Sequence, residues 1–157
     1  MTRANTTKRF YKTHRGFYKL KTPEKFIMPL DETMQSTKLT KSGLFIEYKS
    51  SLEYKFIKYC EVNPHILKFG LESFPIWYVS PKDGKNHRYF VDFVVVFDTG
   101  NTILVEIKPY SQTIAPKGNN AGAWLTYAVN QAKWKAANAF AAERGMKFII
   151  CTEKELK

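Results

Sequence analysis

The clearest structural signal in the chain is RYFVDFVVVF at Arg88–Phe97, followed after a turn by TILVEIK at Thr102–Lys108. Both stretches are rich in β-branched and aromatic residues, and DTGN at residues 98–101 is typical of a tight turn, so together they predict a β-hairpin. Because aliphatic residues fill nearly every other position, we expect the hairpin inside a core sheet.

Beyond Arg88 at its start, the strands of this apolar hairpin carry three charged residues. Asp92 lies in the middle of the first strand, and Glu106 and Lys108 lie on the second. The two-residue period of a strand sends Glu106 and Lys108 to the same face. An unpaired ion inside an apolar sheet is costly. The pattern therefore predicts that a divalent cation and a bound phosphate compensate these charges, although an ordinary surface ion pair between adjacent strands is the simpler alternative.

The same residue types suit the hydrolysis of a phosphodiester. That reaction needs a barrier reduction on the order of 20 kcal/mol, which side chains alone seldom supply. Mg²⁺ prefers oxygen ligands and keeps several waters, so one or two carboxylates and a phosphate oxygen satisfy it. We expect Asp92 and Glu106 to bind the ion, and Lys108 to orient or deprotonate the attacking water and to offset negative charge in the transition state.

A helix is expected before the hairpin. Ser50 and Glu53 have the spacing of a capping box, and apolar residues recur at helical intervals as far as Cys60. Asn63-Pro64 ends the pattern, which predicts a helix from Ser51 to about Glu61. Glu53 has two interpretations: it closes the capping box, or it reaches the predicted site as a further metal-binding acid.

The remaining elements complete an α-β-β-β-α-β order with three strands in a meander. Phe74–Ser80 (FPIWYVS) predicts the strand before the hairpin, and the aperiodic Pro109–Ala123 predicts a loop. An alanine-rich helix is expected at Tyr127–Arg144, followed by Lys147–Cys151 as a strand that returns parallel through a right-handed crossover. The residues expected to let this helix lie close on the sheet are Ala132, Ala136, Ala137 and Ala139.

The overall composition limits the class of protein. The chain has 157 residues, 44% hydrophobic and 15% aromatic, which suits one domain with a substantial core. Its net charge of +11 indicates a polyanionic partner, most commonly nucleic acid. It has no long apolar span, lipidation motif or membrane-surface helix, so no membrane partner is expected. The absence of an apolar signal region predicts a cytoplasmic location.

The first 44 residues differ from the rest of the chain. Basic residues recur from Arg3 to Lys25, interleaved with aromatic residues and opposed only by Glu24. This predicts a basic N-terminal arm at residues 1–44 and a compact domain at residues 45–157. Basic and aromatic side chains suit phosphate contact and base stacking, and the arm residues expected to contact DNA are Lys8, Arg9, Lys12 and Arg15. A solvated extension that only a partner orders is an equally good interpretation.

Further candidate DNA contacts lie in the compact domain. Arg88 adjoins the proposed site and is expected to contact a flanking phosphate. Asn130, Lys133 and Lys135 begin the second long helix, where an amide and two cations could hold the phosphate backbone. They are equally well explained as ordinary solvated residues of a helix face.

Several stretches, in this order and spacing, resemble the PD-(D/E)xK nuclease superfamily. The closer likeness is to TnsA-like endonucleases and to the head completion nucleases of T4-like tailed phages. It covers about residues 46–155 and leaves the basic arm unexplained; one departure is Val91, where the family motif has proline before the aspartate. The stretches are Tyr48–Glu53 (YKSSLE), Asn63-Pro64, Arg88–Asp92 (RYFVD), Val105–Pro109 (VEIKP), Val129-Asn130, Lys133–Ala137 (KWKAA) and Arg144–Glu153 (RGMKFIICTE).

The resemblance implies an α/β fold with a restriction-endonuclease-like αβββαβ core, whose mixed central sheet is flanked by helices. It implies Mg²⁺- or Mn²⁺-dependent DNA cleavage, with Asp92 and Glu106 as metal ligands, Lys108 as the catalytic lysine and Glu53 as the acid on the helix. The implied setting is the processing of DNA ends during phage packaging and head maturation, in the host cytoplasm or the virion. The implied partners are DNA and head, portal or neck proteins.

Two other functions remain open from the sequence. One is a non-catalytic DNA-binding virion assembly protein, which the loss of an acid would favour, whereas every acid is present. The other is a transposon-end or junction-resolving nuclease, which would require a partner recombinase or a symmetric dimer.

Overall fold

The computed structural model describes residues 17–19, 45–47 and 49–156. Residues 17–19 and 45–47 are β1 (Phe17–Lys19) and β2 (Phe45–Glu47), which pair antiparallel. The arm residues Lys8, Arg9, Lys12 and Arg15, which the sequence suggests as DNA contacts, lie outside the described residues.

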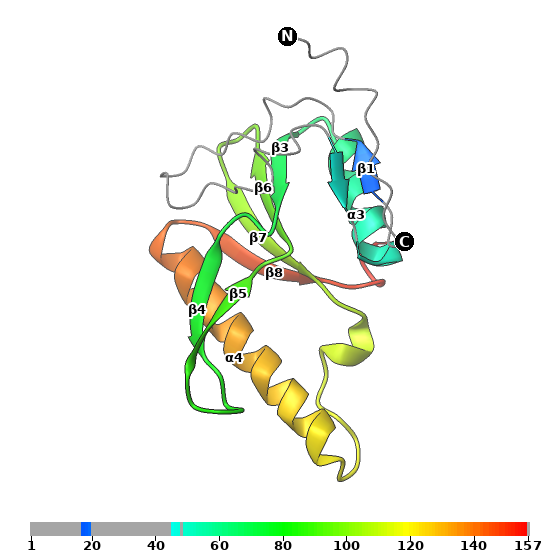
Figure 1. Ribbon diagram of the computed structural model, residues 1–157. Coiled ribbons are helices and arrows are strands. Elements are labelled where there is room, and N and C mark those ends of the chain that lie inside the picture. The colour runs from blue at the N-terminus through cyan, green and yellow to red at the C-terminus, as the bar shows by residue number, and fades with distance from the viewer. Residues whose placement is uncertain (1–16, 20–44, 48, 157) are drawn as a thin grey trace.

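Four strands form the central sheet, in the order β3-β6-β7-β8 (Figure 1). They are β3 (Ile66–Leu71), β6 (Phe93–Phe97), β7 (Thr102–Ile107) and β8 (Lys147–Cys151). β6 runs antiparallel to both of its neighbours, whereas β7 and β8 run parallel. The α/β class, the mixed central sheet and the parallel return of the last strand are confirmed.

Two helices cover opposite faces of this sheet, α3 (Ser51–Val62) and α4 (Ala121–Glu143). Successive residues of a strand point to opposite faces, so an almost wholly apolar strand such as β6 builds a core on each side. The core on the α3 face includes Phe56, Ile57, Cys60, Phe93, Val95, Val105 and Ile107. The core on the α4 face includes Val94, Val96, Leu104, Trp134, Ala137 and Ala141.

Helix α3 begins where the capping pattern predicts. The side chain of Ser50 accepts a hydrogen bond from the backbone N–H of Glu53 at 3.1 Å, which satisfies one of the free donors at the start of the helix. The helix ends at Val62, one residue beyond the predicted Glu61, and the N–H of Asn63 closes the last turn on Tyr59 O at 3.0 Å.

A separate two-stranded sheet is formed by β4 (Pro75–Val79) and β5 (Asn86–Phe90). The predicted meander is confirmed in part: Phe74–Ser80 does pair, as β4, with the first half of the predicted strand Arg88–Phe97, but it does not lie beside the second half, β6. The neighbour of β6 is instead β3, which the sequence analysis did not predict. Lys68 and Gly70 interrupt the apolar pattern of β3, so its strand signal is weak. β4 packs on α4 and pairs with no strand of the central sheet.

The predicted single strand Arg88–Phe97 is divided at Asp92. β5 ends before this residue and β6 begins after it. Strict alternation would place Val91 and Val94 on opposite faces, yet both lie in the core on the α4 face. The bend at Asp92 therefore shifts the alternation by one residue and lets a continuous apolar stretch serve two sheets.

Helix α4 begins at Ala121 rather than at Tyr127. The side chain of Asn120 caps it by accepting from the N–H of Ala123 at 3.1 Å. The predicted loop before the helix is correspondingly shorter and includes the 3-10 turn η3 (Tyr110–Gln112). The small and polar residues around the cap hid this start, because they lack apolar periodicity. Neither helix described here has the length and apolar character needed to cross a membrane.

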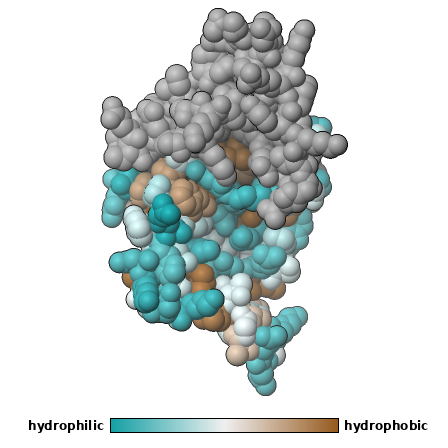
Figure 2. All heavy atoms as spheres, viewed as in Figure 1, coloured by the Kyte–Doolittle hydropathy of each residue, from teal (hydrophilic) through white to brown (hydrophobic). Residues whose placement is uncertain are grey.

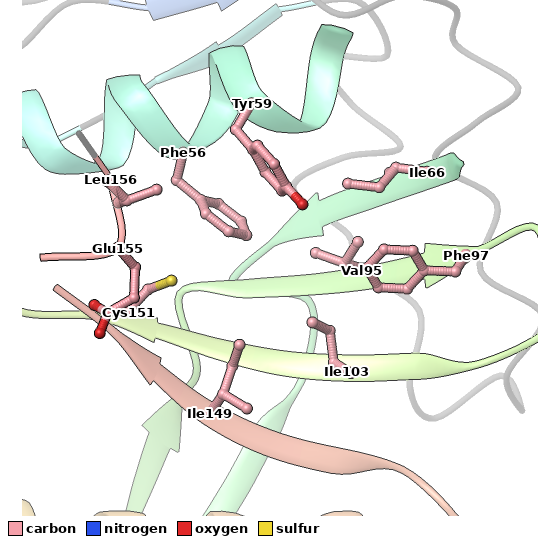
Figure 3. Close-up of a pocket in the computed structure, with 10 residues that line it drawn as sticks. All are labelled: Phe56, Tyr59, Ile66, Val95, Phe97, Ile103, Ile149, Cys151, Glu155 and Leu156. Carbon is pink, nitrogen blue, oxygen red and sulfur yellow. The ribbon is translucent and has the colours of Figure 1, made fainter. Parts of the chain in front are cut away.

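A cavity of about 220 Å³ lies between α3 and the strands of its sheet face. In Figure 3, Phe56 and Tyr59 point from α3 towards Val95, Ile103 and Ile149 on the strands. The remaining lining residues are Ile66, Phe97, Cys151, Glu155 and Leu156. The lining is mostly apolar and contains none of the predicted catalytic residues, so this cavity is not the predicted site.

The helix positions against the sheet generate a stability prediction. Ala137 is fully buried on the sheet side of α4, whereas Ala139, also predicted to face the sheet, is exposed. We expect Ala137→Leu to lower the free energy of unfolding by about 1–3 kcal/mol, because the larger side chain overpacks the helix–sheet contact. Ala139→Leu is the matched control and should change it by less than about 0.5 kcal/mol. Urea unfolding measures both, and equal effects would contradict the packing of α4 described above.

Candidate active site

The structure brings Asp92, Glu106 and Lys108 together at the end of β7. The backbone N–H of Ile107 donates to Asp92 Oδ2 at 2.8 Å, which ties the bend between β5 and β6 to the neighbouring strand. Lys108 Nζ lies 3.4 Å from Glu106 Oε1. The two acids and the lysine thus occupy one place in the fold, as the hairpin pattern predicts.

Glu106 is held by two partners, one on each carboxylate oxygen. Its side chain is 5% exposed, and Oε2 accepts a hydrogen bond from the Tyr89 hydroxyl at 2.6 Å while Oε1 faces Lys108. Burial and the nearby charge of Glu106 raise the pKa of Tyr89, so its phenol stays protonated and remains a donor. Tyr89 was not predicted from the sequence, because its contact with Glu106 depends on how β5 packs beside β7.

Asp92 lies in an unfavourable place for a charged carboxylate. Burial, followed by repulsion from Glu106, raises its pKa to about 8, against the lowering effect of the Ile107 N–H bond. Lys108 also lowers the pKa but does not offset the other effects. Two neighbouring carboxylates that repel one another and are only partly compensated form a donor set that a hard divalent cation would stabilise.

The donor set fits Mg²⁺ or Mn²⁺ bound through few protein ligands. In the part of the chain that the structure describes, no three His, Cys, Asp or Glu side chains are gathered into a complete metal cage. Mg²⁺ commonly binds through one or two carboxylates and fills its other positions with water and substrate phosphate. Asp92 and Glu106 are the residues that would hold such an ion.

Glu53 lies on the first turn of α3, within electrostatic range of the site. Its Oε2 accepts from the backbone N–H of Lys49 at 2.7 Å, so the carboxylate does reach back over the start of the helix. Burial raises the pKa of Glu53, and the charge of Glu53 in turn raises that of Asp92. In a capping box the Glu53 carboxylate would accept its bond from the N–H of Ser50, whereas the observed donor is Lys49, one residue earlier, so the predicted box is not closed on Ser50 itself. The catalytic role of Glu53 stays a prediction.

Glu72 is a further acid at the site that the sequence analysis did not identify. It follows β3 with φ of 43°, a left-handed conformation that is uncommon for a residue other than glycine. Its N–H donates to the carbonyl oxygen of Asp92 at 3.1 Å, and its side chain pairs with Lys49. Strained backbone of this kind gathers at functional sites. Glu72 was missed because β3, which positions it, was itself not predicted.

The candidate DNA-contacting residues among residues 45–157 lie at different positions relative to the predicted catalytic residues. Lys133 Nζ lies 5.6 Å from the ring centroid of Tyr89, so Lys133 adjoins the partner of Glu106. Asn130 is half-buried about one turn earlier on α4, and Lys135 is exposed on another face of that helix. Arg88 is exposed on β5, on the approach to Asp92. Of these four, Lys133 is the residue that contacts the surroundings of Glu106, whereas Arg88 is linked to the site through its place four residues before Asp92.

Two comparisons with known proteins bear on this site. Residues 63–153 match the family described as TnsA-like endonuclease N terminal. The head completion nuclease of Enterobacteria phage T4 is 35% identical over 122 residues, which cover 71% of this chain and 81% of the relative. The family match spans Asp92, Glu106 and Lys108 but begins after Glu53. The extent of both matches shows that the chain belongs to the TnsA-like endonuclease family.

Proposed function

We propose that this protein is a divalent-cation-dependent endonuclease that hydrolyses phosphodiester bonds of DNA. The observation that carries the proposal is the meeting of Asp92, Glu106 and Lys108 at the end of β7, fixed by the bond from the Ile107 N–H to Asp92. Membership of an endonuclease family agrees with it. The net charge of +11 favours a polyanionic substrate.

Each residue of the site has a role in this reaction. Asp92 and Glu106 would hold Mg²⁺ or Mn²⁺, which supplies a Lewis acid for the phosphate and lowers the pKa of water. Lys108 lies beside Glu106, where its ammonium can orient the attacking water and stabilise charge on the phosphate oxygens. Tyr89 keeps the Glu106 carboxylate in one orientation. The water oxygen then gives up a proton and bonds to phosphorus, while the bond from phosphorus to one deoxyribose oxygen breaks and that oxygen takes up a proton.

We assign the activity to the completion of phage heads, where packaged DNA ends are processed. The support is the T4 relative, which is named a head completion nuclease and is aligned over 81% of its length. In this setting the partners besides DNA would be proteins of the head, portal or neck, and the protein would act in the host cytoplasm or the virion.

Removing the site residues should abolish cutting but not binding. We expect Asp92→Ala and Lys108→Ala to lower the rate of DNA cleavage at least about 100-fold in Mg²⁺, because each removes a group that acts on the reacting phosphate. DNA affinity should remain within a few-fold, since phosphate contacts elsewhere dominate it. Gel assays of cleavage and filter binding measure the two quantities, and EDTA should stop the cutting by the wild type.

The matched control is Lys147→Ala, which removes an exposed lysine. Lys147 pairs with Ile103, about five residues and therefore roughly 16 Å along β7 from Lys108. This variant should cut like the wild type. Equal cutting by the wild type and both site variants would remove the site assignment, and DNA binding without any cutting would favour a non-catalytic assembly protein.

The raised pKa of Asp92 predicts that replacing its carboxyl group with a neutral amide stabilises the protein at high pH. The pKa is about 8 in the folded protein and 3.8 ordinarily, so the folded state binds the extra proton and loses stability as pH rises between these values. In EDTA we expect Asp92→Asn to melt at least about 5 °C above the wild type near pH 9, with little difference near pH 4. The Asn side chain can keep the bond from the Ile107 N–H.

Thermal melting across this pH range, with and without Mg²⁺, measures the effect. Mg²⁺ should raise the melting temperature of the wild type and leave Asp92→Asn nearly unchanged, because the variant lacks one of the two carboxylates. A melting difference that stays constant with pH would show that repulsion at Asp92 is not its cause.

The hydrogen bond from the Tyr89 hydroxyl to Glu106 predicts that removing this hydroxyl weakens the binding of the cation. We expect Tyr89→Phe to raise the Mg²⁺ concentration for half-maximal cutting about tenfold, since outer partners orient metal-binding carboxylates. The rate at saturating Mg²⁺ should fall less. A titration of Mg²⁺ at fixed DNA separates the two effects, and a loss of rate with an unchanged Mg²⁺ requirement would argue against this role.

A further inference from the structure

The outer face of the β4–β5 hairpin exposes aromatic side chains beside the proposed site. Ile76 and Tyr89 point inwards and are buried in the core on the α4 face. The alternate residues point away from α4, and among them Trp77 is 61% and Phe90 39% exposed. We call this outer surface the hairpin face; its residues are Pro75, Trp77, Val79, Asn86, Arg88 and Phe90.

The fold gives no reason for aromatic residues at these positions. Trp77 lies directly across from Arg88 in the strand pairing, and it belongs to neither core cluster of the described residues. Exposed apolar patches of this kind commonly mark binding surfaces. A large flat ring beside a guanidinium is also a combination that proteins use to contact nucleic acid bases and phosphates.

The charges around the hairpin face favour a polyanion over a protein partner. Lys82 and Lys85 lie in its turn, and Arg88 lies on its surface. The one acid of the turn, Asp83, lies 2.8 Å from the His87 ring nitrogen Nε2 through its carboxylate oxygen Oδ2. Within residues 49–156, none of these three cations forms an ion pair with an acidic side chain. The hairpin thus presents positive charge together with exposed rings.

The hairpin face is connected to the site by continuous chain. Phe90 lies two residues before Asp92, which is roughly 7 Å along an extended strand. Arg88 lies four residues before Asp92, which is roughly 13 Å. Stacked nucleotides rise about 3.4 Å each, so the hairpin face lies roughly two to four nucleotides from the proposed reacting phosphate. In Figure 1 the hairpin projects from the sheet in front of α4. Because its inner residues pack on α4, the hairpin face looks away from α4.

We propose that the hairpin face stacks on unpaired DNA bases, so that the preferred substrates are single-stranded ends or junctions of single-stranded and duplex DNA. This inference rests on the proposed function and names its substrate class. In a continuous duplex the faces of the bases are covered by their neighbours, and an indole can reach them only after unstacking. Unpaired bases offer free faces to Trp77 and Phe90, while Arg88 contacts the adjoining phosphate.

The first experiment compares three DNA substrates of matched sequence: a fork with unpaired arms, a fully paired linear duplex and a closed circle. The wild type should cut the fork with the highest kcat/KM. Trp77→Ala should lower the ratio of fork to paired duplex about tenfold, because a stacked base contributes this order of affinity. Trp77→Phe, which keeps a ring, should restore most of the ratio.

The control for loss of exposed apolar surface is Ile149→Ala. Ile149 has the same 39% exposure as Phe90 but lies on β8, outside the hairpin. It should leave the ratio unchanged. If Trp77→Ala cuts all three substrates as the wild type does, or loses equally on all three, the proposed preference for unpaired bases is wrong and a protein partner or general binding explains the surface.

A second experiment measures stacking without cleavage. In EDTA, the fluorescence of 2-aminopurine placed in the unpaired arm should be quenched by the wild type and by Trp77→Phe, and not by Trp77→Ala. If no protein cuts any DNA in Mg²⁺ or Mn²⁺ but the quenching depends on Trp77, the proposed function fails and this inference stands. Quenching that is equal in all three proteins would overturn the inference whether or not the DNA is cut.

Discussion

The candidate site depends on the hydrogen bond from the backbone N–H of Ile107 to the Asp92 carboxylate. This bond holds the bend between β5 and β6 against the end of β7, at 2.8 Å. Without a bend at this point, the apolar stretch would continue as one strand, and the hairpin that bears Tyr89 could not turn to pack on α4. The same contact therefore orients an acid, ends a strand and positions the donor that holds Glu106.

The site concentrates like charges in a place where the fold alone would not favour them. Asp92 and Glu106 are largely buried and repel one another, and Lys108 compensates only part of this repulsion. Glu53 and Glu72 add negative charge nearby, with Lys49 paired between them. Such an arrangement costs stability in the absence of a cation and is characteristic of sites where function outweighs stability.

Short sequence patterns predicted the helix and strand boundaries that depend on neighbouring residues alone. The start of α3 follows from Ser50, whose hydroxyl caps the helix, and β8 follows from a short apolar run after Gly145, which has a left-handed φ of 68° suited to the end of a helix. β3 was missed because polar and glycine residues weaken its pattern, and pairing with β6 supplies what its propensity lacks. The cap at Asn120 was missed because α4 begins in small, aperiodic residues.

From the sequence it was possible to infer that Asp92, Glu106 and Lys108 share one site, because a short turn forces two neighbouring strands into register and the two-residue period places their side chains. Tyr89 and Glu72 could not be inferred in this way. Their contacts depend on the packing of β5 against α4 and on the pairing of β3 with β6, and both join segments whose separation along the chain carries no periodic signal. Periodicity reports which face a residue takes, whereas long-range packing determines what it meets there.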